Sequence, residues 1–314
     1  MHAATTEPCS PPRMTMLMRI RRFLNREGVA GWLFILPVVI GVAIFTYSAL
    51  VYSLYLSLTE WDLLRPPKWT GLSNYHTLLT RDEEFFAALK NTLFFVVTLV
   101  PAGIVCAMSL AILMNRKIKA IGFFRAAYYM PHITSTIAIG MVWLWIFNPD
   151  VGLINTLLKG IGVSDPPQWL SSVFWAKPAL LLMRIWQVTG YYMILYIAGL
   201  QTIPDELYEA ASIDGASPWQ KARYITIPLL ANTTFFVTIM LTIESFNIFE
   251  AVYAMTEGGP GGSTNTLLYY IYTEAFESYR MGYAASISWV LFLIIFSLTL
   301  VQFAIRRRRE RERM

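Results

Sequence analysis

Charged side chains are scarce in this 314-residue sequence: only 14% of its residues are Asp, Glu, Lys or Arg, whereas 56% are hydrophobic. Soluble domains contain about 25% charged and about 45–50% apolar residues. A chain so poor in charge has too little polar surface for an ordinary soluble fold. The shortage therefore excludes a typical globular protein and favours a membrane protein.

Cysteine and histidine are also rare. The chain has two Cys and three His, scattered as Cys9, Cys106, His2, His76 and His132. This spacing contains no metal-ligand motif, and we expect no disulfide. The sequence also lacks a Walker A nucleotide-binding loop and a Ser/His/Asp arrangement. We therefore expect a chain that is not an enzyme, holds no metal or cofactor and does not hydrolyse ATP by itself.

Hydrophobic residues are gathered in six runs, each long enough to cross a bilayer, which takes roughly 20 residues of apolar helix. The runs are Val29–Leu58, Asn91–Leu113, Gly122–Phe147, Pro178–Leu200, Ile225–Phe249 and Ala284–Ile305. They predict an all-α integral membrane protein with six transmembrane helices. The first run far exceeds the apolar part of a signal peptide, so we expect it to remain in the mature protein.

Lys and Arg are distributed unevenly between the segments that flank these runs. They concentrate within the segments Arg13–Arg26, Arg116–Arg125, Lys221–Arg223 and Arg306–Arg313. Because cytoplasmic loops carry the excess of positive charge, both termini are expected in the cytoplasm. The predicted organisation is a cytoplasmic tail over residues 1–28, a transmembrane domain over 29–305 and a basic tail over 306–314. The basic tail is expected to contact membrane lipid, with no role in binding nucleic acid.

A polar segment between the fourth and fifth runs, residues 201–224, carries strong helix-capping signals. Pro204 followed by two acids is typical of a helix start. Gly215 is typical of the residue that ends a helix. Ser217 and Gln220, three residues apart, form a capping-box pattern for a second helix. The segment is therefore predicted to form a helix, a sharp turn and another helix on the cytoplasmic side.

The spacing inside this segment resembles the EAA loop of binding-protein-dependent ABC importer permeases. Glu209-Ala210-Ala211 is followed by Gly215, then by Ile225 and Pro228, in the register of that loop. Asp214-Gly215-Ala216 is similar to the sugar-transporting branch, and the one departure is Ile227, where Leu is common. The resemblance implies that residues 201–224 form a coupling loop that docks on an ATPase. The residues implied are Glu209, Ala210, Ala211, Asp214, Gly215, Ala216, Ile225 and Pro228.

The same resemblance implies an assembly and a location. The fold would be that of a type I ABC importer permease in the bacterial cytoplasmic (inner) membrane. The partners would be a second homologous permease, a dimer of ABC ATPases and an extracytoplasmic solute-binding protein. ATP and Mg would be bound by the ATPase partner, with no cofactor in this chain. The transported solute would be a sugar or a sugar-like molecule.

Two stretches outside the loop resemble the first, larger permease of maltose, disaccharide and glycerol-phosphate importers. One is Asn148–Leu158, followed by Trp169. The other begins at Thr256–Pro260 and continues through the aromatic segment Leu267–Phe276 to Ala285. Tyr and Trp favour the membrane interface, so this second stretch is open to two interpretations. It either anchors the chain at the membrane surface or contacts the external binding protein.

Polar residues inside the fourth and fifth runs are candidates for the substrate path, because such residues are rare within membranes and often functional. They are Arg184, Gln187, Tyr191, Glu244, Asn247 and Glu250. Arg184 and Glu244 should lie at similar depths, about 8–9 Å below the outer surface at helical rise. They form either a structural ion pair or part of a polar wall that binds sugar hydroxyls. The spacing leaves both possibilities open.

Two other classes of function compete with an ABC importer. A secondary transporter driven by an ion gradient would be expected to show internal repeats and broken helices. The two halves of this sequence show no repeat, and the EAA spacing would have no explanation. A membrane-embedded enzyme would need a cluster of His, Asp, Glu or nucleophilic residues within a run. The sequence contains no such cluster.

Overall fold

The computed structural model describes residues 27–115 and 120–311. The contacts divide the chain into two compact units, Met1–Tyr55 and Leu56–Met314. The predicted tail over 1–28 and the basic residues 116–119 fall almost wholly outside the described residues. Within the first unit, helix α2 (Glu27–Val42) and a π-helical turn (Ala43–Tyr47) lead into α3 (Ser48–Ser57). Their described apolar side chains are exposed up to Tyr55, which is the expected state of a helix made to lie in lipid or against another chain.

The second unit begins with a small hairpin that the all-α prediction did not include. Strands β1 (Thr59–Glu60) and β2 (Lys68–Trp69) pair antiparallel, with Thr59 opposite Trp69. Asp62 turns the connection, because its carboxylate accepts hydrogen bonds from the backbone N–H of Leu64 and Arg65. These turn residues lie outside the apolar runs, so hydrophobic patterning did not predict the hairpin.

The rest of the second unit is helical. Its helices are α4 (Ser73–Thr80), α5 (Glu83–Met114), α6 (Ile121–Ile133), α7 (Thr136–Ile146), α8 (Leu153–Gly160), α9 (Ala176–Leu200), α10 (Asp205–Ile213), α11 (Pro218–Lys221), α12 (Ile227–Leu229), α13 (Ala231–Phe246), α14 (Glu250–Met255), α15 (Leu267–Tyr272) and α16 (Met281–Arg311). Two further π-helical turns, η2 (Ala222–Thr226) and η3 (Thr273–Glu277), join α11 to α12 and follow α15.

Four helices among the described residues are long and apolar enough to cross a membrane. They are Phe34–Ser57, Glu83–Met114, Ala176–Leu200 and Met281–Arg308. A fifth is formed if Pro218–Leu229 and Ala231–Phe246, which meet at 69°, count as one bent span. The third predicted span is divided into α6 and α7, because Thr134 and Ser135 adopt extended backbone between them. The chain is thus an all-helical membrane protein apart from its hairpin, with four or five such spans in the described part.

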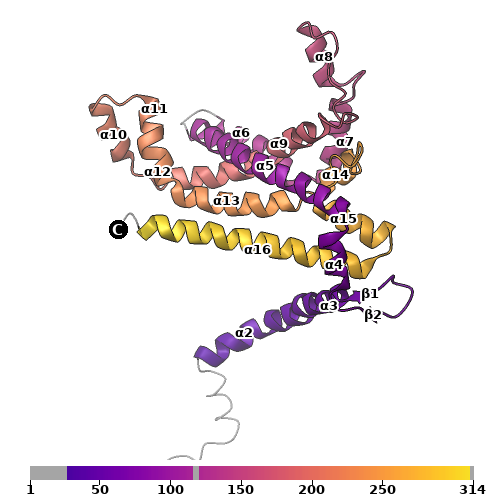
Figure 1. Cartoon of the computed structure of the whole chain (residues 1–314). Helices are drawn as coiled ribbons and strands as arrows, with labels where there is room; N and C mark the ends of the chain where they lie inside the picture. The colour runs from indigo at the N-terminus through magenta and orange to yellow at the C-terminus, as the bar shows by residue number, and fades with distance from the viewer. Residues whose placement is uncertain (1–26, 116–119, 312–314) are drawn as a thin grey trace, which may run out of the picture. The chain divides into compact units, whose positions relative to one another are not determined.

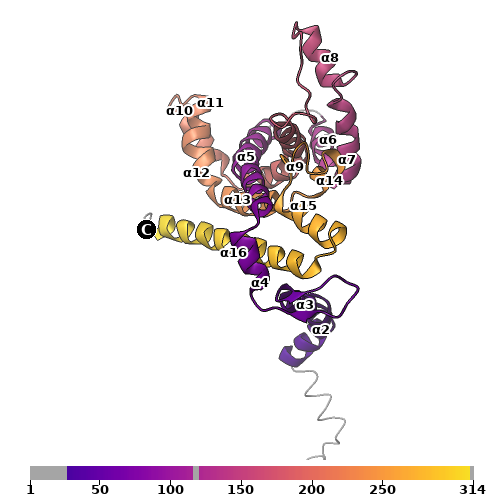
Figure 2. The same ribbon diagram turned by 45° about the vertical axis from the view of Figure 1, so that its right-hand side comes forward.

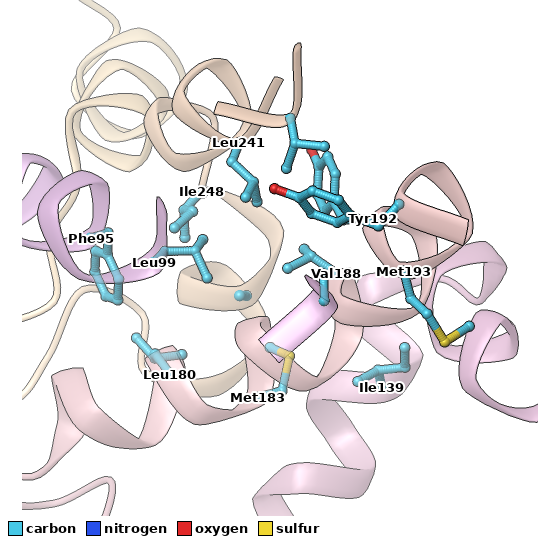
Figure 3. Close-up of a cluster of buried hydrophobic side chains, with 14 of the residues drawn as sticks. Phe95, Leu99, Ile139, Leu180, Met183, Val188, Tyr192, Met193, Leu241 and Ile248 are labelled. Carbon is cyan, nitrogen blue, oxygen red and sulfur yellow. The ribbon is translucent and has the colours of Figure 1, made fainter. Parts of the chain in front are cut away.

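The main core lies where α5, α9 and α13 pack together, with residues of α7 and α14 added to it. Figure 3 shows Leu99, Met183, Val188 and Leu241 converging in one cluster. Gly190 permits the crossing of α9 and α6, because a Cβ there would lie 1.8 Å from the carbonyl oxygen of Tyr128. The absence of a side chain at this position therefore determines how closely the two helices approach.

The second unit has two distinct ends. Figures 1 and 2 show α10, α11 and the C-terminal end of α16 at one end, with α14 and α15 at the other. At the second end, Asp82 caps α5 by accepting from the backbone N–H of Phe85 at 2.8 Å. Its other oxygen accepts hydrogen bonds from the hydroxyl groups of Tyr270 and Tyr283. Asp82 thereby ties the starts of α5, α15 and α16 together.

Candidate functional site

The first candidate site is the exposed segment formed by α10, α11 and the turn between them. Helix α10 ends in a complete Schellman motif, with Gly215 in the left-handed region at φ 75°. The N–H of Ala216 donates to the carbonyl oxygen of Ala211 at 2.8 Å, and that of Gly215 donates to Ser212 at 3.1 Å. Ser217 and Gln220 then form the predicted capping box of α11. The predicted helix, turn and second helix are confirmed.

Side-chain contacts hold this segment in a fixed shape. The hydroxyl of Tyr208 on α10 lies 2.9 Å from the hydroxyl of Thr226, just before α12. Lys221 Nζ donates to Ser212 Oγ at 2.5 Å, which joins the two short helices. Because α12 and α13 meet at a sharp bend near Leu230, the segment projects from the end of the bundle, as Figures 1 and 2 show.

The predicted coupling residues are only partly brought together. Glu209, Ala210, Asp214 and Gly215 are exposed on the segment, with Ala211 and Ala216 half-buried beside them. Ile225, in contrast, packs against the main core. Pro228 lies at the bend between α12 and α13, where it lines a cavity together with residues of α5 and α16. The six predicted residues within the range 209–216 are placed to contact a partner, whereas Ile225 and Pro228 shape the support behind them.

Sequence reasoning missed the large apolar side chains on the same segment. Ile213 is 87% exposed, Tyr224 75% and Trp219 72%. Exposed apolar groups of this size are typical of a protein-binding surface. A signal was present, since they are bulky apolar residues inside an otherwise polar loop.

The second candidate site is a polar network between α9 and α13. Arg184 on α9 donates from Nη2 to Glu244 Oε1 on α13 at 2.8 Å and from Nη1 to Gln187 Oε1 at 2.5 Å. The other oxygen of Glu244 accepts from the Tyr192 hydroxyl at 2.8 Å. Arg184 and Glu244 form a direct ion pair, which confirms that they lie at similar depths. A partly buried pair of this kind is stable only when its remaining polar atoms are also bonded, as most are here.

Gln187 links this network to α7. Its amide nitrogen donates to the Thr136 hydroxyl at 3.0 Å, just beyond the break between α6 and α7. Thr136 was not among the predicted residues. Three helices, α7, α9 and α13, therefore meet at one set of hydrogen bonds. The break at Thr134 and Ser135 brings the start of α7 to this point.

The fifth predicted span is not one helix: it bends by 69° near Leu230, and its last turn is also wrong. Ile225–Phe249 was expected to be one helix carrying Asn247 and Glu250 on a shared face. Instead, α13 ends at Phe246, and α14 starts at Glu250 after an interruption. The interruption is stabilised from outside the helix, because the Thr266 hydroxyl donates to the carbonyl oxygen of Ile248 at 2.8 Å. No pattern within the run indicates that distant contact.

A cavity of about 360 Å³ lies at this interruption. Its lining includes five of the six predicted path residues: Arg184, Gln187, Glu244, Asn247 and Glu250. The sixth, Tyr191, is not in the lining. Its ring stacks on His132, with centroids 4.5 Å apart, and His132 lines the cavity in its place. His132 is not among the six predicted path residues, although a polar residue inside a predicted span is itself a signal.

The loop between α14 and α15 is clamped to α5 beside this cavity. The Asn91 amide donates to the carbonyl oxygens of Gly262 at 2.9 Å and Asn265 at 2.8 Å. Thr92 Oγ1 accepts from the backbone N–H of Leu267 at 2.9 Å. Just beyond, burial and the hydrogen bond to Asp82 raise the pKa of the Tyr270 hydroxyl well above its usual value. The glycine-rich loop is thus held by buried hydrogen bonds.

No group of three or more His, Cys, Asp or Glu side chains that could hold a metal ion was found among residues 27–115 and 120–311. The polar atoms gathered in the cavity are amides, carboxylates, a guanidinium and an imidazole, most of them already bonded to one another. Such groups bind hydroxyl-bearing molecules through hydrogen bonds.

Comparisons with known proteins agree with this arrangement. Residues 100–311 match the family described as binding-protein-dependent transport system inner membrane component. The lactose transport system permease protein LacF of Rhizobium radiobacter is 38% identical over 90% of this chain and 95% of its own. The probable ABC transporter permease protein YesP of Bacillus subtilis (strain 168) is 36% identical over 91% of this chain and 93% of its own.

A solved structure shares the fold. It is the bacterial alginate ABC transporter in complex with an alginate pentasaccharide-bound periplasmic protein, with a TM-score of 0.78 and 23% identity over 92% of this chain and 98% of that chain. The relatives are permease subunits, which are transport components and not enzymes. The chain belongs to the family of binding-protein-dependent transport system inner membrane components, as a permease of an ABC transporter.

Proposed function

We propose that this chain is one of two homologous permeases in an ATP-driven importer for a sugar or sugar-like solute. The observation that carries the proposal is the segment formed by α10 and α11, with a Schellman motif ending α10 and a capping box starting α11. Ile213, Trp219 and Tyr224 are exposed in and beside it. It provides a preformed surface on which an ABC ATPase dimer, holding ATP and Mg, can dock. LacF, a relative whose name specifies lactose, supports a saccharide as the solute.

The proposed topology has six spans and both termini in the cytoplasm. Counting α6 with α7 and α12 with α13 adds two bent spans to the four long helices. The segment α10–α11 and the basic end of α16 lie at the same end of the second unit. Lys and Arg at that end favour the cytoplasmic side. The opposite end, with the Gly258–Asn265 loop, then faces the extracytoplasmic solute-binding protein.

In the proposed mechanism, the importer alternates between outward and inward access. Closure of the ATPases would move α10 and α11, and the bend at Leu230 passes this displacement into α13. Helix α13 carries Glu244 and ends at the cavity, so the motion would reach the proposed substrate path. The second permease would complete the path, so this chain alone should not transport.

Co-purification tests the proposed docking surface. With the importer expressed as a whole, Glu209→Lys or Gly215→Asp should reduce recovery of the ATPase with the tagged permease. Asp165→Lys is the matched control, since it changes an exposed acid outside the coupling segment. Uptake by this chain alone in proteoliposomes without ATP would contradict the proposal and favour a secondary transporter.

Cysteine labelling tests the topology. In a chain with Cys9 and Cys106 replaced by Ser, a single Cys is introduced at Ser217 or at Ser164, both exposed. A membrane-impermeant maleimide added to cells whose outer envelope is permeable should label the Cys at 164 and spare the Cys at 217. The reverse pattern would contradict the proposed orientation.

A further inference from the structure

The cavity at the α13–α14 interruption has unequal numbers of carboxylate and guanidinium groups in its lining. Beside the imidazole of His132, its lining contains one guanidinium, that of Arg184, and two carboxylates, those of Glu244 and Glu250. The positive charge is already neutralised, because Arg184 lies 2.8 Å from Glu244. The uncompensated charge that remains in the lining is therefore negative.

The guanidinium of Arg184 is paired inside the protein. Its two terminal nitrogens each donate one hydrogen bond, one to Glu244 and the other to Gln187. Its Nε is buried and has no hydrogen-bond partner. Glu244 has one oxygen bonded to Arg184 and the other to Tyr192. The positive charge in the lining therefore stays beside a carboxylate.

Two side chains beside the interruption remain open to a solute. Asn247 and Glu250 are exposed on either side of the interruption, and neither side chain bonds another group in the described part of the chain. An amide can both donate to and accept from sugar hydroxyls, whereas a carboxylate only accepts. An ammonium or hydroxyl group suits Glu250, but a second carboxylate or a phosphate would be repelled by it.

We infer that the cavity selects uncharged or amino sugars and rejects anionic ones, such as uronic acids and sugar phosphates. This inference rests on the proposed function, since it concerns the same substrate path. Glu250 is the specificity-determining residue: it supplies the only charge in the lining, among the described residues, that lacks an opposite charge beside it.

Ligand-observed saturation-transfer NMR on the assembled importer in nanodiscs tests this selection. The solute-binding protein is left out, so that it does not impose its own specificity. The probes are lactose (neutral), lactosamine (cationic at pH 6.5) and lactobionate (anionic). Lactose and lactosamine should bind, and lactobionate should bind at least about tenfold more weakly, the factor expected from one uncompensated charge near the ligand.

Variants separate charge from shape, because lactobionate also differs from lactose in having an open chain. Glu250→Gln removes the charge and keeps the size, so it should raise lactobionate binding relative to lactose by about tenfold. Glu257→Gln is the control, since it changes an exposed acid that lines a different cavity, and it should leave the ratio unchanged.

The outcomes distinguish this inference from the proposed function. Equal binding of lactose and lactobionate, or an unchanged ratio in Glu250→Gln, would overturn the charge selection while leaving the substrate path in place. Failure of all three probes to bind, in an importer that still couples to its ATPase, would contradict the assignment of the path itself and the selection with it.

Discussion

Asn91 on α5 holds Gly262, 171 residues further along the chain, through a hydrogen bond of 2.9 Å from its side-chain amide to the glycine carbonyl oxygen. A second bond from the same nitrogen reaches Asn265. The buried amide thus anchors the loop between α14 and α15 from the start of the second predicted span. Without this anchor, two carbonyl groups would lose their partner.

Asn91→Ala should therefore loosen the glycine-rich loop. Leaving buried carbonyls unsatisfied costs about 1–3 kcal/mol per group. Hydrogen exchange of residues 258–267, followed by mass spectrometry, should show faster exchange in the variant. Lys90→Ala, at the exposed neighbouring position, is the control. Equal protection in both variants would contradict the clamp.

Arg184→Met should destabilise the bundle strongly. It leaves the Glu244 carboxylate in a low-dielectric site with only the Tyr192 hydroxyl as partner. Breaking one side of a buried pair costs about 3–5 kcal/mol. Thermal unfolding in detergent measures the loss, and adding Glu244→Gln to Arg184→Met should restore part of it. A double variant no more stable than the single one would show that the pair is not coupled.

Gln187→Ala and Asn247→Ala should both impair uptake, for different reasons. Gln187 bonds Arg184 and Thr136, so its loss should also lower the unfolding temperature. The Asn247 side chain is exposed at the interruption, so its loss should reduce ATP-dependent uptake while unfolding and assembly stay unchanged. Unaltered uptake in both variants would remove these residues from the substrate path.

Gly215→Ala should weaken docking of the ATPase more than Gly215→Asn. A side chain at φ 75° is strained by roughly 1–2 kcal/mol, whereas Asn tolerates this conformation better. Both side chains have space, because no atom lies within 4 Å of a Cβ at this position. The ATPase recovered with the tagged permease measures the effect, and an equal loss in both variants would argue against a conformational cause.

Gly190→Ala should separate α6 from α9. The added Cβ would overlap the Tyr128 carbonyl oxygen, and overpacking of a core typically costs 1–3 kcal/mol. Because α6 also carries His132, uptake should fall together with thermal stability. Gly160→Ala is the control, since nothing lies within 4 Å of a Cβ there. A stable, active Gly190→Ala variant would show that the crossing adjusts easily.

Local chemistry alone was enough to predict the membrane class and the helix, turn and second helix around Gly215. A helix must be about 20 apolar residues long to cross a bilayer, so the length of an apolar run indicates a membrane span. The uneven distribution of Lys and Arg between the two sides indicates the orientation of the chain. The turn at Gly215 and the box at Ser217 and Gln220 involve residues at most a few positions apart. Their geometry depends on backbone capping, which needs no tertiary partner. For that reason the helix, turn and second helix were predictable, and their spacing carried the family resemblance.

Only the tertiary structure decided how the proposed substrate path is built. The interruption after Phe246 is stabilised by Thr266, and the third span is broken where Thr136 meets Gln187. His132 lines the cavity where Tyr191 was expected, and the rings of these two residues stack between α6 and α9. Each of these outcomes depends on groups far apart in sequence whose unpaired polar atoms must find partners inside an apolar bundle. That requirement acts across helices, so no periodicity within one helix reveals which partner satisfies it.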